Sequence, residues 1–213
     1  MNGPVLVMGA TSGIGARAVD EAVRHGIPVT AFARGAAELD AGPLVAPVAG
    51  DARSPEDVAR ALDGVEAVIY ALGIRERLGM LWQEETLFSE TTRVLIEAMG
   101  ARGVRRLVAV TGFGAGRSRA AMSLVERAGF KAVLGKPYED KARQEALIEA
   151  SGLDWTIVRP VILTNSARTG RYRVLRDPAR WRNGLISRAD VAAYLIDAVV
   201  QGLDMRADVV LTR

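Results

Sequence analysis

The stretch that decides the fold lies near the start of the chain, where a glycine-rich turn joins an apolar run to a helical pattern. It reads Val5-Leu6-Val7-Met8-Gly9-Ala10-Thr11-Ser12-Gly13-Ile14-Gly15. An apolar run of strand length ends at Gly9, and residues 16–25 have the pattern of an amphipathic helix. A second apolar run follows over residues 29–34. The stretch therefore predicts a βαβ unit.

The three glycines of this turn predict a dinucleotide-binding loop. Gly9 suits a tight turn out of the strand, Gly13 a close approach of the backbone to a pyrophosphate, and Gly15 close packing of the helix on the sheet. The helix N-terminus would offer N–H groups and the positive end of its dipole to the phosphates. A glycine triplet by itself is a weak signal, but here the strand before it and the helix and strand after it are all present. The alternative is a structural turn that is merely glycine-rich.

Arg34, at the end of the second strand, favours NADP(H) over NAD(H). An NAD-selective site places Asp or Glu there to accept hydrogen bonds from the ribose, whereas Arg34 cannot accept one and suits a 2′-phosphate. Arg17, one turn into the helix, would add a second positive charge. The alternative for both arginines is an ordinary solvated position.

Length and composition limit the possible classes of protein. The 213 residues predict a single domain over 1–213, and 49% hydrophobic with 25% charged residues are values of a globular protein. The absence of cysteine excludes disulfides, thiolate nucleophiles and Cys-ligated metals, and we expect no metal site. With no signal-like or membrane-length apolar run, we expect a cytoplasmic protein. The net charge of +3 comes from arginines spread along the chain, so nucleic acid is not an expected partner.

Further apolar runs predict more strands of a parallel sheet, at residues 44–48, 67–73, 106–111, 153–160 and 208–212. Ligands of such sheets bind at the carboxyl ends of the strands. Asp51 lies at one such end and would accept a hydrogen bond from the adenine amino group, or else bond its local backbone. Ser54 and Ser187 are expected to cap helices.

The remaining segments predict helices and substrate-side loops. Helices are expected from Glu85 to Arg102 and from Pro137 to Ala150. Residues 112–135 open with a glycine-rich stretch that we expect to be flexible, as a lid or a partner surface. Residues 161–183 would form a second substrate-side loop. Its arginines over 168–182 would form a wall for an anionic substrate or a solvated hairpin.

Taken together these motifs resemble an atypical short-chain dehydrogenase/reductase of the NAD(P)H-binding, NmrA-like and biliverdin/flavin-reductase-like group. The resemblance rests on the glycine loop with Arg34 and Asp51, on Thr111, on Lys141-x-x-x-Glu145, and on residues 151–160, SGLDWTIVRP. Residues 186–192, ISRADVA, match the start of a helix found in the same group. The resemblance covers nearly the whole chain.

This resemblance implies an α/β Rossmann-type, doubly wound parallel sheet in the order 3-2-1-4-5-6-7, flanked by helices in three layers. It places the nicotinamide near Thr111, Lys141 and the loop from Pro160 to Leu163, with Lys141 bonding the nicotinamide ribose. The cofactor-binding residues expected in all are Gly9, Ala10, Thr11, Ser12, Gly13, Ile14, Gly15, Arg34, Asp51, Ala52, Ala71, Leu72, Gly73, Thr111, Lys141, Pro160, Val161, Ile162 and Leu163.

The catalytic tyrosine of the family departs from its usual spacing. Short-chain dehydrogenases use Tyr-x-x-x-Lys, in which the lysine lowers the tyrosine pKa. Four residues before Lys141 stands Pro137, whereas Tyr138 is three residues before it. Thr111, Tyr138 and Lys141 are the catalytic candidates. His25, the single histidine, follows the first helix at the opposite end of the sheet and is not expected to act as an acid or base.

The sequence thus predicts an NADPH-dependent oxidoreductase that transfers hydride to a small organic acceptor such as a flavin, quinone or carbonyl compound. The scarcity of proton donors favours a proton from solvent, as in flavin-reductase-like members. One alternative is a non-catalytic NADP(H)-binding redox sensor of the NmrA-like type, which would act on a protein partner. A nucleotide-sugar epimerase or dehydratase is a third possibility, but those enzymes are longer and keep the Tyr-x-x-x-Lys pair.

Overall fold

The computed structural model describes residues 3–73 and 86–213, and the side chains outside 124–135. Strands and helices alternate for most of this length. In chain order the strands and helices are β1 (Val5–Met8), α1 (Gly13–Arg24), β2 (Val29–Ala33), η1 (Ala36–Glu38), β3 (Val45–Ala49), α2 (Pro55–Ala61), β4 (Ala67–Tyr70), α3 (Leu87–Arg102), β5 (Arg106–Val110), η3 (Gly116–Ala121), α4 (Leu124–Ala150), β6 (Asp154–Pro160), β7 (Ile162–Thr164), β8 (Arg173–Leu175), η4 (Pro178–Arg180), β9 (Leu185–Ser187), α5 (Arg188–Val200) and β10 (Ala207–Thr212).

The central sheet confirms the predicted Rossmann-type fold. Its strand order is β3-β2-β1-β4-β5-β6-β10-β8. The strands from β3 to β10 pair in parallel, which gives the expected seven-strand order with β10 as the seventh strand. The sequence analysis did not predict β8, which adds an antiparallel edge strand beside β10. A separate parallel pair joins β7 to β9.

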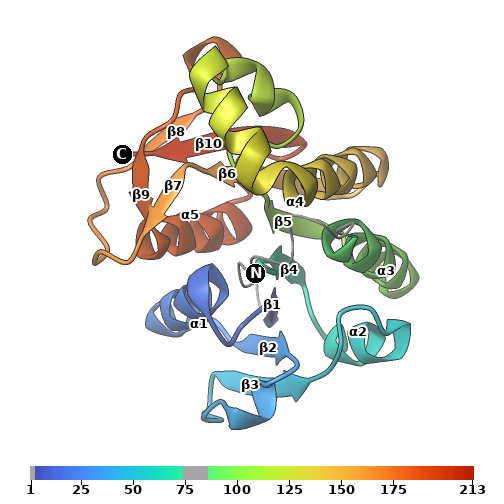
Figure 1. Cartoon of the computed structure of the whole chain (residues 1–213). Coiled ribbons are helices and arrows are strands. Elements are labelled where there is room, and N and C mark those ends of the chain that lie inside the picture. The colour runs from blue at the N-terminus through green and yellow to red at the C-terminus, as the bar shows by residue number, and fades with distance from the viewer. Residues whose placement is uncertain (1–2, 74–85) are drawn as a thin grey trace.

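Helices cover both faces of this sheet (Figure 1). Helices α1 and α5 pack together on one face, while α2, α3 and α4 line the other. Strands β1, β4 and β5 are buried along their whole length. This explains their unbroken apolar sequence, because a parallel sheet with helices on both faces has no solvent-facing side.

Local chemistry at several helix ends follows the prediction. The Ser54 hydroxyl accepts a hydrogen bond from the Asp57 N–H at the start of α2, and Ser187 accepts one from the Asp190 N–H at the start of α5. At the end of α3, Gly103 adopts a left-handed conformation with φ 69°. Glu85, where the sequence analysis began this helix, lies outside the described residues.

One prediction for residues 112–150 was wrong. The helix does not begin at Pro137: α4 runs from Leu124 to Ala150 with Pro137 inside it, because packing against α3 overrides the helix-breaking tendency of proline. The glycine-rich start of the expected flexible loop is packed rather than exposed. Residues 112–115 are buried, and the buried Ser118 hydroxyl donates to the Ala115 carbonyl at 2.6 Å.

Candidate functional site

The glycine loop has the geometry that a dinucleotide cradle requires. Gly9 has φ 86°, and a Cβ atom added to it would lie 2.7 Å from the carbonyl oxygen of Ala71. A Cβ atom added at Gly15 would lie 2.1 Å from the carbonyl oxygen of Gly9. Gly13 has φ 60° and open space around its Cβ position. Two glycines therefore permit close backbone packing, and the third permits the turn.

The N-terminus of α1 is open to an anion. Ser12 occupies the cap position, but within the described part of the chain its side chain accepts no hydrogen bond from the helix. The first turn contains no acidic residue, and Thr11, Ser12 and Gly13 are exposed. The N–H groups of this turn can thus meet a pyrophosphate, which the helix dipole also favours.

Arg34 lies beside this loop. It follows the last residue of β2, is exposed, and makes no hydrogen bond or ion pair with any described residue. The Cβ position of the adjacent Gly35 is 4.0 Å from the Thr11 methyl carbon. Arg17 differs, since its guanidinium pairs with Asp20 on the same helix at 3.5 Å. The structure therefore makes Arg34 the stronger candidate for contact with a 2′-phosphate.

The turn after β3 carries the predicted adenine contact. Asp51 is exposed, and its Oδ1 accepts a hydrogen bond from the Arg53 N–H at 3.0 Å. Its own N–H donates to Asp57 Oδ2 at 2.9 Å. Asp51 Oδ2 accepts no hydrogen bond from the part of the chain that the structure describes. Asp51 thus bonds its local backbone with one oxygen, while the neighbouring Ala52 side chain is buried.

The end of β4 borders the same cradle. The Ala71 N–H donates to the Met8 carbonyl at 3.0 Å, and the Ala71 carbonyl is the atom that a side chain at Gly9 would strike. Leu72 packs against a core cluster, and Gly73 is exposed. The predicted residues 71–73 therefore flank the glycine loop.

Lys141 and Tyr138 come together beside the end of β5. The Lys141 ammonium donates to the Thr111 carbonyl at 2.5 Å, and its Nζ lies 5.1 Å from the Tyr138 ring centroid and 5.0 Å from that of Phe88. Burial lowers the pKa of Lys141 to about 8, and the nearby Glu145 carboxylate opposes that shift. The Tyr138 hydroxyl lies next to Gly112, where an added Cβ would be 2.7 Å from it.

The Thr111 hydroxyl turns into the protein. This side chain is 3% exposed, and its Oγ1 donates to Glu145 Oε1 at 2.6 Å. Glu145 in turn receives two hydrogen bonds from Arg159, at 2.9 and 2.8 Å. The backbone of Thr111 meets Lys141, whereas its hydroxyl is engaged with a buried carboxylate.

Asp140 contacts the start of another helix, α3. It lies inside α4 with no exposed surface, and its carboxylate accepts hydrogen bonds from the N–H groups of Phe88 and Ser89, at 2.7 and 3.3 Å. The Ser89 hydroxyl adds a third at 2.5 Å. Asp140 thereby caps α3 from α4 and fixes the helix that carries Lys141. An acidic residue inside a helix pattern gives no sequence signal for such a contact.

The loop from Pro160 to Leu163 follows the end of β6. Its backbone is fixed, because the Pro160 carbonyl accepts from Phe113 at 3.0 Å and the Val161 N–H donates to Leu211 at 3.1 Å. Ile162, 57% exposed, pairs in register with the equally exposed Leu185 of β9. These two side chains form an apolar surface after the strand end, where the substrate is expected.

The rest of the second substrate-side loop is held by Asp190. Its Oδ1 accepts from the N–H groups of Thr169 and Gly170, both at 2.8 Å, and its Oδ2 accepts from the hydroxyls of Thr169 and Ser187. Burial would raise the pKa of Asp190, but these hydrogen bonds outweigh it and hold the pKa below its ordinary value.

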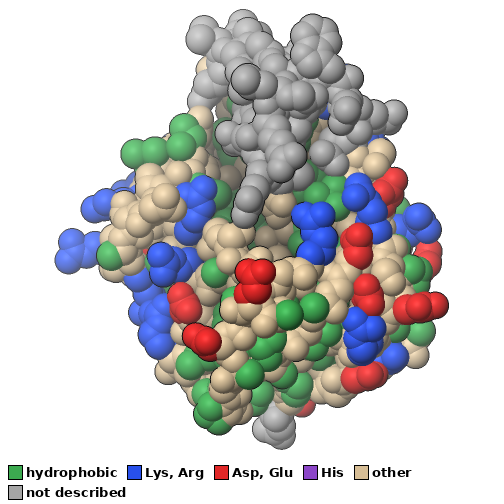
Figure 2. All heavy atoms as spheres, turned by 60° about the horizontal axis from the view of Figure 1, so that its bottom comes forward, with side chains coloured by type: hydrophobic (Ala, Val, Ile, Leu, Met, Phe, Trp, Pro, Cys, Tyr) green, Lys and Arg blue, Asp and Glu red, His purple; other side chains and the backbone are tan. Residues whose placement is uncertain are grey.

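The arginines over 168–182 do not form a hairpin. Arg173 begins β8, which pairs with β10; Arg168 reaches Glu21 on α1 at 3.3 Å; and Arg176 pairs with Asp204 at 2.5 Å. Figure 2 looks onto the β3 edge of the sheet, and Lys and Arg side chains gather on its left flank, the side of α1 in Figure 1. His25 caps the far end of α1, away from the glycine loop, as predicted.

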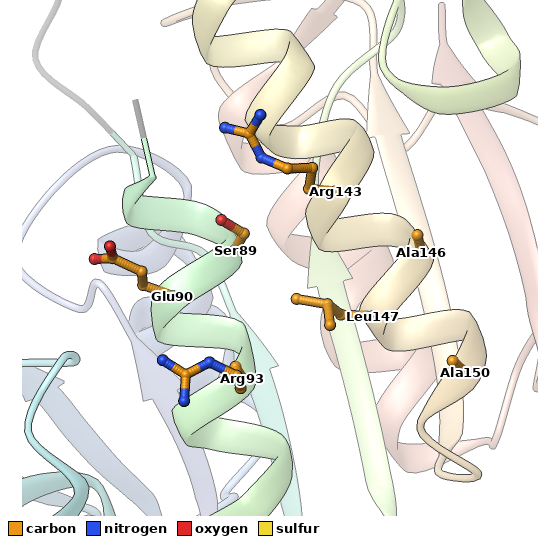
Figure 3. A pocket seen from close by; sticks show the side chains of 7 residues that line it. All are labelled: Ser89, Glu90, Arg93, Arg143, Ala146, Leu147 and Ala150. Carbon is orange, nitrogen blue, oxygen red and sulfur yellow. The ribbon is translucent and has the colours of Figure 1, made fainter. Parts of the chain in front are cut away.

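A surface hollow of about 500 Å³ lies elsewhere, between α3 and α4. Figure 3 shows the residues that line it: Ser89, Glu90, Arg93, Arg143, Ala146, Leu147 and Ala150. It contains none of the predicted site residues, so we place the candidate site at the strand ends and not in this hollow. Among the described residues, no helix has the length and apolar character needed to span a membrane.

Comparison with known proteins shows the family of this chain. A family model described as NAD(P)H-binding matches residues 9–201. The Bacillus subtilis protein named uncharacterized sugar epimerase YhfK is 32% identical over 162 residues, which are 75% of this chain and 69% of that one.

Two solved structures share the fold over nearly the whole chain. The structure of ChuY, an anaerobillin reductase from Escherichia coli, is similar with a TM-score of 0.82 and 27% identity, over 98% of this chain and 96% of that one. A short-chain dehydrogenase/reductase from Veillonella parvula in complex with NADP is similar with a TM-score of 0.83, over 100% and 95% of the two chains. Its identity of 17% shows a common fold alone.

Proposed function

Because the chain belongs to the NAD(P)H-binding family, we propose that it is an NADPH-dependent oxidoreductase that transfers hydride to a small organic acceptor. A flavin, a quinone or a carbonyl compound is the expected acceptor. The observation that carries the proposal is an open glycine cradle with the Lys141 ammonium at one end and, at the other, Arg34, which has no partner among the described residues.

The adenosine half of the cofactor would lie between β2, β3 and α1. Arg34 would pair with the 2′-phosphate, and the free oxygen of Asp51 would accept from the adenine amino group. The pyrophosphate would bind the open N–H groups at Ser12 and Gly13. These four residues are exposed, so the cofactor could reach them without breaking a described contact within the protein.

The nicotinamide half would lie over the ends of β4, β5 and β6. Lys141 would bond the ribose hydroxyls, and residues 71–73 and 160–163 would flank the ring. The cofactor supplies the hydride, so the protein has to orient it against the acceptor. The exposed pair of Ile162 and Leu185 gives an apolar acceptor a surface to pack on.

Few side chains near the nicotinamide half can donate a proton to the acceptor. The Thr111 hydroxyl already donates to Glu145, so it is not available to an acceptor. Tyr138 is close to Lys141, but it precedes the lysine by three residues instead of four and its hydroxyl lies against Gly112. Solvent is therefore the proposed proton source, with Tyr138 as the side chain to test.

The name of one solved relative supports a reductase. ChuY is described as an anaerobillin reductase. The test is a calorimetric titration of the purified protein with NADPH, NADP⁺, NADH and NAD⁺, followed by NADPH oxidation with a panel of flavins, quinones and aldehydes. We expect tight NADPH binding and oxidation that depends on one acceptor class. Tight binding with no acceptor-dependent rate would refute the reductase.

The altered tyrosine spacing favours one second candidate, a non-catalytic NADP(H) sensor that acts on a protein partner. Such a sensor must bind the oxidised and reduced cofactors with different affinities, because a ligand pair with equal affinities shifts no equilibrium. Equal binding of NADP⁺ and NADPH would exclude it. The name of the Bacillus subtilis relative adds nucleotide sugars to the substrate panel, although Pro137 stands where epimerases of the family carry their tyrosine.

A further inference from the structure

A cluster of four charged side chains, of which Arg117 is exposed and the other three are buried, lies behind the nicotinamide half of the proposed site. Arg159 on β6 has no exposed surface and pairs with Glu145 of α4 on one side and Asp208 of β10 on the other. Asp208 also receives two hydrogen bonds from Arg117 of η3. Two guanidiniums thus meet two carboxylates. Burial would raise the pKa of Asp208, but the hydrogen bonds from Arg117 and Arg159 hold it below its ordinary value.

Stability alone is a poor explanation for such a cluster. Removing charges from water has a large desolvation cost, and a buried ion pair replaced by well-packed apolar side chains often leaves a protein equally stable or more stable. A planar guanidinium that binds a carboxylate through two hydrogen bonds does fix that carboxylate in position. The cluster is therefore better suited to holding Glu145 in one place than to stabilising the fold.

Glu145 connects the cluster to the site. It stands four residues after Lys141 in α4, so both side chains lie on the same face of the helix. Its Oε1 accepts from the Thr111 hydroxyl at 2.6 Å, and the Thr111 carbonyl accepts from the Lys141 ammonium at 2.5 Å. One residue, Thr111, separates the fixed carboxylate from the amine that would meet the cofactor.

The same carboxylate also lies against the loop that follows β5. A Cβ atom at Gly116 would be 2.0 Å from Glu145 Oε2, so the backbone of η3 packs directly on this oxygen. The next residue, Arg117, binds Asp208 with Nε–Oδ2 2.6 Å. Both Arg117 and Arg159 have their guanidinium carbon 5.1 Å from the Trp181 ring centroid. The base of η3 is thus fastened to both carboxylates of the cluster.

We propose that Glu145 is a positioning residue for the nicotinamide half of the cofactor. Held by Arg159, it fixes Thr111 and the base of η3, and so sets where Lys141 meets the nicotinamide ribose. The inference rests on the proposed function for the identity of the ligand, and it assigns Glu145 no direct contact with cofactor or substrate.

The test compares two ligands on the same variants. NADPH fills both halves of the site, whereas adenosine 2′,5′-bisphosphate fills the adenosine half alone. Thr111→Val removes the hydrogen bond to Glu145 without changing any charge. The double variant Glu145→Gln/Arg159→Met removes the pair together and leaves Asp208 with Arg117, so that no guanidinium or carboxylate of the cluster is left without a partner.

For both variants we expect the NADPH affinity measured by calorimetry to fall about tenfold, the equivalent of one hydrogen bond to a charged group. The affinity for adenosine 2′,5′-bisphosphate should change by less than about twofold, because this ligand does not reach the nicotinamide half. A change of that size is no larger than the effect of an ordinary surface substitution. Equal weakening of both ligands would show a merely structural role, and unchanged NADPH affinity would show no role. Either result overturns the proposal.

A matched control removes a different ion pair from the same strand. Asp154, at the start of β6 and the opposite end of the sheet, pairs with Arg105 at 3.2 Å and Arg206 at 3.4 Å. Asp154→Asn should leave both affinities unchanged. These readouts are equilibrium affinities, so they test the role of Glu145 even if no acceptor of the panel supports NADPH oxidation by the wild type. That result would refute the proposed reductase activity and leave the proposal for Glu145 standing.

Discussion

The two halves of the proposed cofactor site use charge in opposite ways. In the adenosine half, Arg34 is exposed and has no partner among the described residues. In the nicotinamide half, Arg159 is fully buried and bound to two carboxylates. An unpaired exposed charge is available to select a ligand, whereas a fully paired buried one can only hold its neighbours. Under the proposed function, the adenosine half would therefore select the cofactor and the nicotinamide half would position it.

The largest effect on NADPH binding is expected from adding a side chain inside the glycine loop. Gly15→Ala places a Cβ atom against the Gly9 carbonyl, a backbone contact that cannot move aside. We expect a loss of about 2–3 kcal/mol in the free energy of unfolding and a fall of roughly 100-fold in NADPH affinity. Urea unfolding and calorimetry measure the two effects.

Gly100→Ala is the matched control for this substitution. Gly100 lies inside α3, and an added Cβ there meets nothing within 4 Å. It should raise stability by roughly 0.5–1 kcal/mol and leave NADPH binding unchanged. If Gly15→Ala behaves like this control, the glycine loop does not hold the cofactor.

The next largest effect is expected from reversing the charge of Arg34. Arg34→Asp removes the counter-charge of the 2′-phosphate and supplies an acceptor for the ribose hydroxyls. We expect NADPH affinity to fall between about tenfold and 100-fold and NADH affinity to rise, so that the preference inverts. Arg17→Asp, which breaks an ion pair with Asp20, should change the preference little. Unchanged NADPH affinity in Arg34→Asp would make Arg34 an ordinary surface residue.

At Lys141 we expect an effect of pH on the NADPH affinity. Burial lowers the pKa of this lysine to about 8, so the side chain is a cation below that pH and neutral above it. Because NADPH is an anion, its affinity should fall as the pH rises from 7 to 9. Lys141→Met should weaken binding about tenfold at pH 7 and remove this dependence. A wild-type affinity that is flat over this range would place Lys141 away from the cofactor.

The smallest effect is expected at Tyr138. If solvent supplies the proton, Tyr138→Phe should retain acceptor-dependent NADPH oxidation within about threefold, because a general acid contributes roughly 100-fold or more. The steady-state rate with the best acceptor of the panel measures this. A loss of 100-fold would instead assign the proton to Tyr138 and bring the chain closer to the usual short-chain dehydrogenase mechanism.

The amino-acid sequence alone determined the fold, and it predicted the adenosine half of the proposed site. The glycines, α1, β2 and Arg34 lie within about thirty consecutive residues, and the steric demands on Gly9 and Gly15 leave few alternatives. The unbroken apolar strands likewise predict a parallel sheet covered on both faces, which the structure confirms. Local sterics and periodicity are properties of short segments, so the sequence displays them directly.

The buried contacts behind the nicotinamide half of the proposed site were decided by the tertiary structure alone. Thr111 directly follows β5, whereas Glu145, Arg159 and Asp208 lie on α4, β6 and β10. No spacing in the sequence indicates that these residues meet. The same holds for Asp140, which caps α3 from a helix about fifty residues later in the chain. Packing against α3 also carries α4 through Pro137, against the local preference. These contacts form only when the sheet and its helices are assembled, because each needs partners that the chain brings together from far apart.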